Sequence, residues 1–189
     1  MILGASDFSG RVTFITGPEK GCGKTSLLNY ALGLLRGAGE APAFLGVGFD
    51  GEASALGAGA GSSAAARAPR IACRAGEVFV SSEPFLRSSS CAPEILEALP
   101  GSTALGRLAV ARARRDGLAV LVGAERNEYS ALAIGAIRSE GWARSVLVDG
   151  AMNRITQVCA FRGARFLFAV RASPGDLERN VRAMRRIYA

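Results

Sequence analysis

Residues 17–25, which read GPEKGCGKT, are of the types that bind a phosphate chain. Glycines let successive backbone N–H groups turn toward an anion, and a helix that starts there adds the positive end of its dipole. In such a loop Lys24 would reach the β- and γ-phosphates, and the Thr25 hydroxyl would ligate Mg²⁺. The alternative is a glycine turn that precedes a helix and binds nothing. The residues predicted to contact a nucleotide are Gly17, Gly21, Cys22, Gly23, Lys24, Thr25 and Ser26.

Two details of this loop narrow the prediction. The segment between Gly17 and Gly23 is one residue longer than in the usual phosphate-binding loop. Lys20 and Lys24 are also the only lysines among the 23 basic residues of the chain. Because lysine binds phosphate as a compact point charge, both positions are expected to act on phosphate. For Lys20, a solvated loop residue is an equal alternative.

The flanking segments would hold the loop in place. Apolar content and periodicity predict a strand before the loop, a helix after it and two further strands, at 11–16, 24–36, 43–48 and 144–150. Asp149 ends the last of these strands and would hold Mg²⁺ directly or through water. Asp50 follows the strand at 43–48 and would ligate Mg²⁺ through water or orient the attacking water. The alternative for each is an aspartate in a turn. The predicted metal ligands are Thr25, Asp50 and Asp149, and the predicted catalytic residues are Lys24, Asp50 and Lys20.

The rest of the chain completes an alternating pattern of strands and helices. Residues 51–69 are rich in Gly, Ala and Ser and predict a flexible loop, either a lid or a surface insertion. Asp116-Gly117 lies between two apolar runs and predicts a hairpin, although the second run also suits the main sheet. Ser173 and Pro174 are expected to start a C-terminal helix. The other predicted elements are two short strands within 70–82, a short helix at 92–99, apolar runs at 108–111 and 118–122, a helix at 130–139, a buried strand at 166–170 and a buried helix face of Leu177, Val181, Met184 and Ile187. This order predicts a single domain, 1–189, with a three-layer α/β P-loop NTPase fold, a mainly parallel sheet and an added hairpin.

Composition excludes several other kinds of site. The chain has no histidine, so histidine triads and histidine general bases are absent, and its four cysteines lack the spacing of a zinc site. The formal net charge is +7, but the arginines are spread along the chain without interleaved aromatics, so nucleic acid is not the expected partner. No apolar run has the length of a membrane helix, and the N-terminus carries an early acid and no basic region. A cytoplasmic protein that does not bind membranes is therefore expected. ATP is the expected nucleotide, because the guanine-reading Asn-Lys-x-Asp motif needs a lysine outside the loop.

Several pieces of the sequence resemble a known class of proteins. The longer Gly-Lys-Thr loop is similar to that of dethiobiotin synthetase and the cobyrinate amidases, members of the SIMIBI class of P-loop proteins. Residues 17–30, 48–52 and 148–154 more closely resemble the small P-loop subunit of the lysine 5,6-aminomutase reactivase. The chain departs from that family at Phe49, where arginine is usual, and in its long 51–69 segment.

The resemblance implies an Mg-ATP-dependent ATPase that works with a larger MutS-like ATPase to restore an adenosylcobalamin-dependent mutase whose cobalamin is damaged. It leaves room for a homodimer in which Lys20 neutralises phosphate charge across the interface, as a second lysine does in some SIMIBI relatives. Two alternatives stay open. One is an enzyme of the dethiobiotin synthetase type that activates a small carboxylate, with Arg126, Asn127 and Arg154 as candidate contacts. The other is a module that binds nucleotide without hydrolysing it and thereby switches the 51–69 segment.

Overall fold

The computed structural model describes residues 2–18, 21–47, 70–103, 105–123, 126–150, 163–171, 175 and 177–188. Its elements in chain order are η1 (Ala5–Asp7), β1 (Val12–Thr16), α1 (Lys24–Gly37), β2 (Ala43–Gly46), β3 (Arg70–Cys73), β4 (Val78–Ser82), α3 (Glu83–Arg87), β5 (Pro93–Thr103), β6 (Gly106–Ala113), β7 (Gly117–Val120), α4 (Asn127–Ser139), β8 (Val146–Asp149), β9 (Arg165–Phe168) and α6 (Leu177–Tyr188). The predictions for Lys20, Asp50, Ser173 and residues 51–69 lie outside the described residues.

A seven-stranded sheet forms the centre of the molecule, with the strand order β5-β6-β4-β2-β8-β1-β9. Five neighbouring strands run parallel, in the order β4, β2, β8, β1 and β9. β6 is antiparallel to both of its neighbours, β4 and β5. β1 and β2 lie on either side of β8, and α1 connects them. Strands covered on both faces are nearly continuous apolar runs, so the predictions of β1, β2 and β8 from such runs are confirmed.

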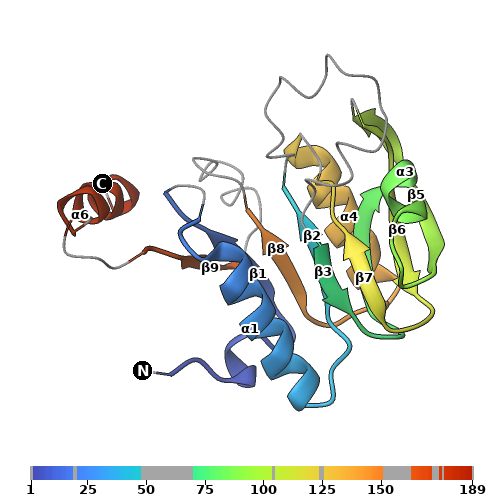
Figure 1. The fold of residues 1–189 in the computed structure, drawn as a ribbon, viewed down its shortest axis with the longest axis horizontal. Coiled ribbons are helices and arrows are strands. Elements are labelled where there is room, and N and C mark those ends of the chain that lie inside the picture. The colour runs from blue at the N-terminus through green and yellow to red at the C-terminus, as the bar shows by residue number, and fades with distance from the viewer. Residues whose placement is uncertain are drawn as a thin grey trace.

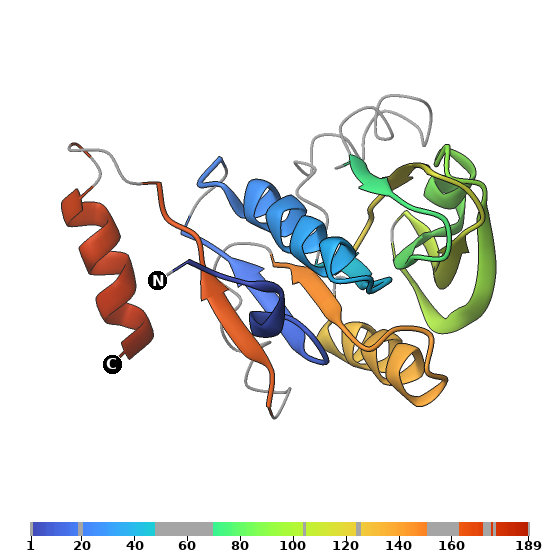
Figure 2. The same cartoon turned by 90° about the horizontal axis from the view of Figure 1, so that it is seen from below.

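Alternating side chains along the strands divide the core into two parts. On one face the core contains Ile15, Phe44, Phe79 and Leu147 of the sheet with Leu28, Leu32 and Leu35 of α1. On the other face it contains Phe14, Leu45, Val80 and Val148 of the sheet with Ala133, Ile134 and Ile137 of α4. Helices therefore cover both faces of a mostly parallel sheet, which gives an α/β fold in layers (Figures 1 and 2).

A second, two-stranded sheet made of β3 and β7 lies on the same side of the main sheet as α1. Ile71 of β3 and Ala119 of β7 are buried in the same core as α1. Part of the face that a helix would cover in a regular α/β fold is thus covered here by this small sheet.

The prediction of a short helix at 92–99 is wrong. Pro93–Thr103 form β5, an antiparallel partner of β6 whose register shifts twice along its length. Such irregularities take apolar residues out of strict alternation. Ile95, Leu96 and Leu99 therefore fall at a helix-like spacing in a segment that is a strand.

The hairpin predicted around Asp116-Gly117 is also wrong. β6 already lies between β5 and β4, and β7 pairs with β3 in the small sheet, not with the main sheet. The Asp116 carboxylate accepts a hydrogen bond from Ala75 N at 2.8 Å, which ties its turn to the turn after β3. The hairpin that the structure adds to the parallel sheet is β5–β6.

The C-terminal elements form where they were predicted but are less buried. β9 is the last strand of the sheet and is half-buried throughout. α6 lies beyond β9 at one end of the molecule (Figure 1), with Leu177 65% and Met184 37% exposed. The prediction of a buried strand is therefore wrong, because an edge strand has a neighbour on one side alone. The predicted buried helix face is wrong at Leu177 and Met184, which are exposed. Within the described ranges, no helix is long and apolar enough to cross a membrane.

Candidate functional site

The junction between the 17–25 loop and α1 is built on glycines in left-handed backbone. The φ angle is 79° at Gly21 and 101° at Gly23, values that other residues rarely adopt. Gly23 is the N-cap of α1, and no side-chain hydrogen bond caps the helix in the described part of the chain. The first amides of a helix lack partners within it and carry the positive end of its dipole. The loop therefore presents backbone donors at the position where the sequence predicts phosphate.

Gly17 and Cys22 pack the loop against the end of the sheet. A Cβ at residue 17 would lie 2.3 Å from Cys22 Sγ and 2.5 Å from the Ala169 carbonyl oxygen. Ala169 N in turn donates to Thr16 O at 2.7 Å, which joins the ends of β9 and β1. Because the Cys22 side chain is buried, a contact of Cys22 with a ligand would come from its backbone.

Three of the predicted functional side chains meet at the start of α1. Thr25 Oγ1 lies 3.4 Å from Asp149 Oδ2, at the long end of hydrogen-bond distances. Lys24 Nζ lies 3.8 Å from Cys22 Sγ, so its ammonium group folds back over the loop. Ser26 follows on the exposed side of the same turn. A hydroxyl, a carboxylate, a cation and uncapped amides thus share one small region.

Strand register explains why Asp149 meets a helix more than 100 residues earlier in the chain. β8 runs parallel to β1 with Asp149 opposite Ile15, so both strands end at the same edge of the sheet. Gly150 N donates to Ile15 O at 2.7 Å, and a Cβ at residue 150 would lie 3.1 Å from that oxygen. The Asp-Gly pair therefore places the carboxylate beside α1 while its glycine packs on β1.

Not every predicted residue can be placed. Lys20, Asp50 and Arg154 lie outside the described residues, and the side chain of Asn127 is not described, so their roles stay predictions. Within the described ranges, no group of three or more His, Cys, Asp and Glu residues gathers to hold a metal. Mg²⁺ keeps several waters and takes one or two carboxylates with phosphate oxygens. Of the three predicted metal ligands, the described ones are Thr25 and Asp149.

A contact between two glycines, which the sequence did not predict, lies at this edge close to Arg126 in the chain. A Cβ at Gly123 would lie 2.3 Å from Gly46 O, so the chain crosses the end of β2 at Gly123. The signal in the sequence is a glycine at the end of each apolar run, which favours close approach of two backbones.

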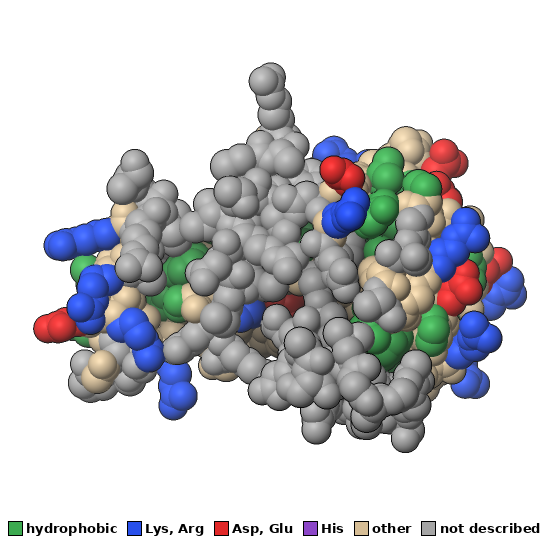
Figure 3. Space-filling model, turned by 90° about the horizontal axis from the view of Figure 1, so that it is seen from above, with side chains coloured by type: hydrophobic (Ala, Val, Ile, Leu, Met, Phe, Trp, Pro, Cys, Tyr) green, Lys and Arg blue, Asp and Glu red, His purple; other side chains and the backbone are tan. Residues whose placement is uncertain are grey.

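Figure 3 looks onto the edge of the sheet where these strands end. Basic side chains surround α6 at one end of this view. Comparisons of the chain with protein-family models, with curated proteins and with solved structures found no match.

Proposed function

We propose that the protein is a Mg²⁺-dependent ATPase whose 17–25 loop and α1 hold the phosphates of the nucleotide. The observation that carries this proposal is the meeting of Thr25 and Asp149 at a glycine-built, uncapped helix start. Phosphate oxygens accept hydrogen bonds from the first amides of a helix and are favoured by its dipole. Lys24 adds a positive charge within reach of the same place.

The residues present suit a bound Mg²⁺ ion. Thr25 Oγ1 and Asp149 Oδ2 are close enough to ligate one cation, and both are oxygen donors of the kind that Mg²⁺ prefers. Bound Mg²⁺ would neutralise charge that develops on the phosphates. The chain itself would position the phosphates through the loop amides and Lys24, since phosphoryl transfer depends mainly on positioning and electrostatics. In this proposal Asp50 orients the attacking water, and Lys20 supplies a second cation.

The test is release of phosphate from Mg·ATP by the wild type and by Lys24→Ala. The variant is expected to lose activity by roughly 100-fold or more, as when one group that stabilises a transition state is removed. Arg138→Ala, at an exposed residue in the last turn of α4, is the matched control and is expected to keep wild-type activity. Equal rates for the wild type and a folded Lys24→Ala protein would exclude the proposed ATPase.

A narrower role is proposed as well: the ATPase serves as a reactivating factor for an adenosylcobalamin-dependent aminomutase, together with a MutS-like ATPase. The support for this role is the sequence resemblance of residues 17–30, 48–52 and 148–154. The expected result is that the chain copurifies with such a mutase and restores its activity in an ATP-dependent way, and that Lys24→Ala restores none. Failure to copurify with, or to reactivate, any such mutase would exclude this role without affecting the ATPase.

A further inference from the structure

The segment that leads into α4 is fixed to the main sheet by a buried serine. Ser81 of β4 donates to Val120 O at 2.7 Å and accepts a hydrogen bond from Val122 N at 3.2 Å. All three residues are buried. These bonds fix the path of the chain after β7 as far as Val122.

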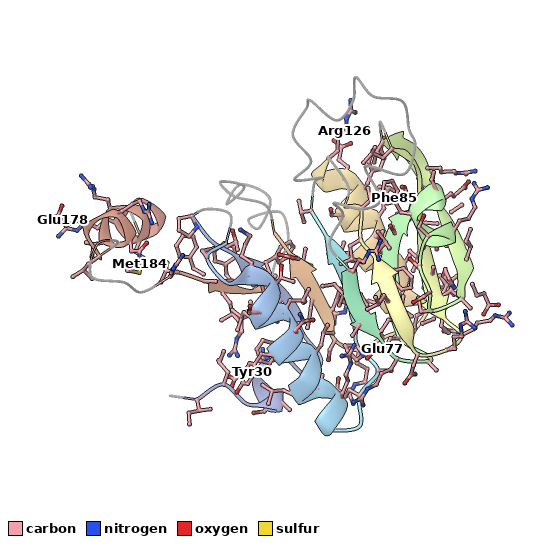
Figure 4. The ribbon with its side chains drawn as sticks, in the orientation of Figure 1. Tyr30, Glu77, Phe85, Arg126, Glu178 and Met184 are labelled. Carbon is pink, nitrogen blue, oxygen red and sulfur yellow. The ribbon has the colours of Figure 1, made fainter. Side chains whose placement is uncertain are left out.

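That path ends at the edge of the sheet that also carries Asp149. Gly123 packs on the carbonyl of Gly46, and Val47 N donates to Asp149 O at 2.8 Å. Figure 4 shows Arg126 at the start of α4, on the side toward which β2 and β8 point. Since α1 and α4 cover opposite faces, the two helices begin at one edge but on different sides of it.

Ser130 holds a buried hydroxyl beneath the first turn of α4. The residue is 2% exposed, and among the described residues its Oγ has no hydrogen-bond partner. It shares the sheet-facing side of the helix with the buried residues Ala133, Ile134 and Ile137. The Cα–Cβ bond of a helical residue tilts toward the N-terminus, which directs the Ser130 side chain toward the first turn. Buried polar groups almost always have a partner, and the described residues supply none to this hydroxyl, so it is available to a group that enters the first turn.

The charges around this helix start favour an anion. In the described part of the chain no side-chain hydrogen bond caps α4, and its N-cap residue is the exposed Arg126. The first-turn amides and the helix dipole add positive character. Glu128 is the acidic residue of this turn, but it is exposed and lies two positions from Ser130, on the opposite side of the helix.

We propose that the start of α4 is a second anion-binding site, which takes a phosphate or carboxylate group through the first-turn amides, Arg126 and Ser130. It is distinct from the 17–25 loop, because β8 separates β1 from the end of β2, where Gly123 packs ahead of α4. A nucleotide and a second anionic ligand can therefore bind at the same edge together. The site would give the proposed ATPase a place for a second, anionic substrate.

The experiment follows backbone amide signals of the ¹⁵N-labelled full chain during titration with inorganic phosphate or with acetate. Each titration is done with and without saturating Mg²⁺ and a non-hydrolysable ATP analogue. The amides of residues 127–131 are expected to show saturable shifts in both conditions. The probe with the higher affinity tells whether the site prefers phosphate or carboxylate.

Three variants test the assignment. Arg126→Gln is expected to weaken probe binding about tenfold, the scale of one lost hydrogen bond to a charged group. Ser130→Ala is expected to weaken it several-fold without lowering the melting temperature of the anion-free protein, since the hydroxyl it removes has no partner. Arg138→Gln, at the other end of α4, is the matched control and is expected to bind the probe as the wild type does.

The results that would overturn the second anion site differ from those that would overturn the proposed ATPase. Lys24→Ala is expected to lose nucleotide binding and to keep the shifts at 127–131. Absence of saturable shifts with both probes, loss of the shifts when the nucleotide analogue is bound, or equal weakening by Arg126→Gln and Arg138→Gln would each overturn the second site. Saturable shifts at 127–131 in a protein that binds no nucleotide would support this site and contradict the ATPase.

Discussion

Gly17 is the most tightly constrained residue of the candidate phosphate loop. A Cβ there would meet both Cys22 Sγ and the backbone oxygen of Ala169, and the backbone contact cannot be relieved by a rotamer change. We expect Gly17→Ala to destabilise the protein by about 1–3 kcal/mol, as overpacking does, and to weaken binding of a fluorescent ATP analogue. Urea denaturation and a binding titration measure the two effects.

Gly33 is the matched control for that substitution. It lies within α1, and a Cβ there would have no heavy atom within 4 Å beyond the two adjacent residues and the nearby backbone of the helix. Gly33→Ala is expected to stabilise the protein by about 0.5–1 kcal/mol through the higher helix propensity of alanine. The steric interpretation of Gly17 fails if the two substitutions change stability in the same direction.

The contact of Thr25 with Asp149 gives a second prediction at the scale of residues. Asp149→Asn keeps the size of the side chain and removes its charge, so Mg²⁺-dependent nucleotide affinity is expected to fall about tenfold or more. Affinity for ATP without Mg²⁺ is expected to rise slightly, because a negative charge near the phosphates is lost. Calorimetric titrations with and without Mg²⁺ measure both effects.

Asp116→Asn is the control for the charge change. Asp116 is exposed and lies in the turn before β7, and the oxygen that accepts from Ala75 N is retained in asparagine. Its nucleotide affinity is expected to equal that of the wild type in both conditions. An unchanged Mg²⁺ requirement in Asp149→Asn would exclude Asp149 as a metal ligand.

At the scale of elements, a buried ion pair joins the end of α1 to the turn between β3 and β4. Arg36 Nε and Nη2 donate to the two carboxylate oxygens of Glu77 at 2.6 and 2.7 Å. Arg36 Nη2 also donates to Ala72 O, and Arg74 N donates to Glu77. The Glu77 side chain is 2% exposed, so this bidentate pair is nearly free of solvent screening.

Removal of one residue of this ion pair is therefore expected to lower the free energy of unfolding strongly. Glu77→Ala leaves the Arg36 guanidinium largely buried without its carboxylate, and a loss of about 3–5 kcal/mol in the free energy of unfolding is expected. Glu94→Ala, which breaks the exposed pair between Glu94 and Arg114, is expected to cost less than about 1 kcal/mol. Urea denaturation of both variants measures the difference, and similar losses would contradict the structural importance of the buried pair.

Local sequence signals predict the elements around the loop and fail where pairing over long distance decides. β1, α1 and β8 are predictable because each has a signal within a few residues of it. The signal is an apolar run for β1, a glycine turn before α1 and an Asp-Gly pair at the end of β8. β5 is not, because its register shifts hide the alternation of its side chains. The pairing of β7 with β3 depends on β6 already having two neighbours, which no local motif encodes. Thr25 and Asp149 are predictable as a pair because parallel strands end at one edge, whereas the buried hydroxyl of Ser130 becomes visible through packing alone.

At the scale of the whole molecule, two carboxylates join segments that are far apart in the chain. Asp7 pairs with Arg165 of β9 at 2.7 Å, and the same guanidinium donates to the Asp7 backbone carbonyl. Glu40 accepts hydrogen bonds from the hydroxyls of Ser9 and Ser145. The N-terminal segment, the chain after α1 and the starts of β8 and β9 are thus tied together at the edge of the sheet opposite to the candidate site.

These contacts predict a loss of stability in acid. The Gly4 N–H and the Arg165 guanidinium lower the pKa of Asp7 below its usual 3.8. Burial acts to raise the pKa of Glu40, but hydrogen bonds from Ser145 and Ser9, with the charge of Arg144, outweigh it and lower the pKa below 4.5. A carboxyl whose pKa is lower in the folded state stabilises the fold above its unfolded pKa. That stabilisation is lost as the pH falls through the folded value, so the decline is expected below about pH 4.5.

The double variant Asp7→Asn/Glu40→Gln isolates this contribution. It is expected to unfold at lower urea concentration than the wild type at pH 7, because both carboxylates are ionised and bonded there. The difference should shrink as the pH falls below 4.5, because the wild-type carboxyls become protonated and their charge-assisted bonds weaken. Glu140→Gln, at an exposed residue after α4, is the control and is expected to unfold as the wild type does at pH 7. Urea midpoints between pH 7 and pH 3 measure the effect, and a difference that stays constant or grows in acid would show that these two carboxylates do not hold the N-terminal segment in place.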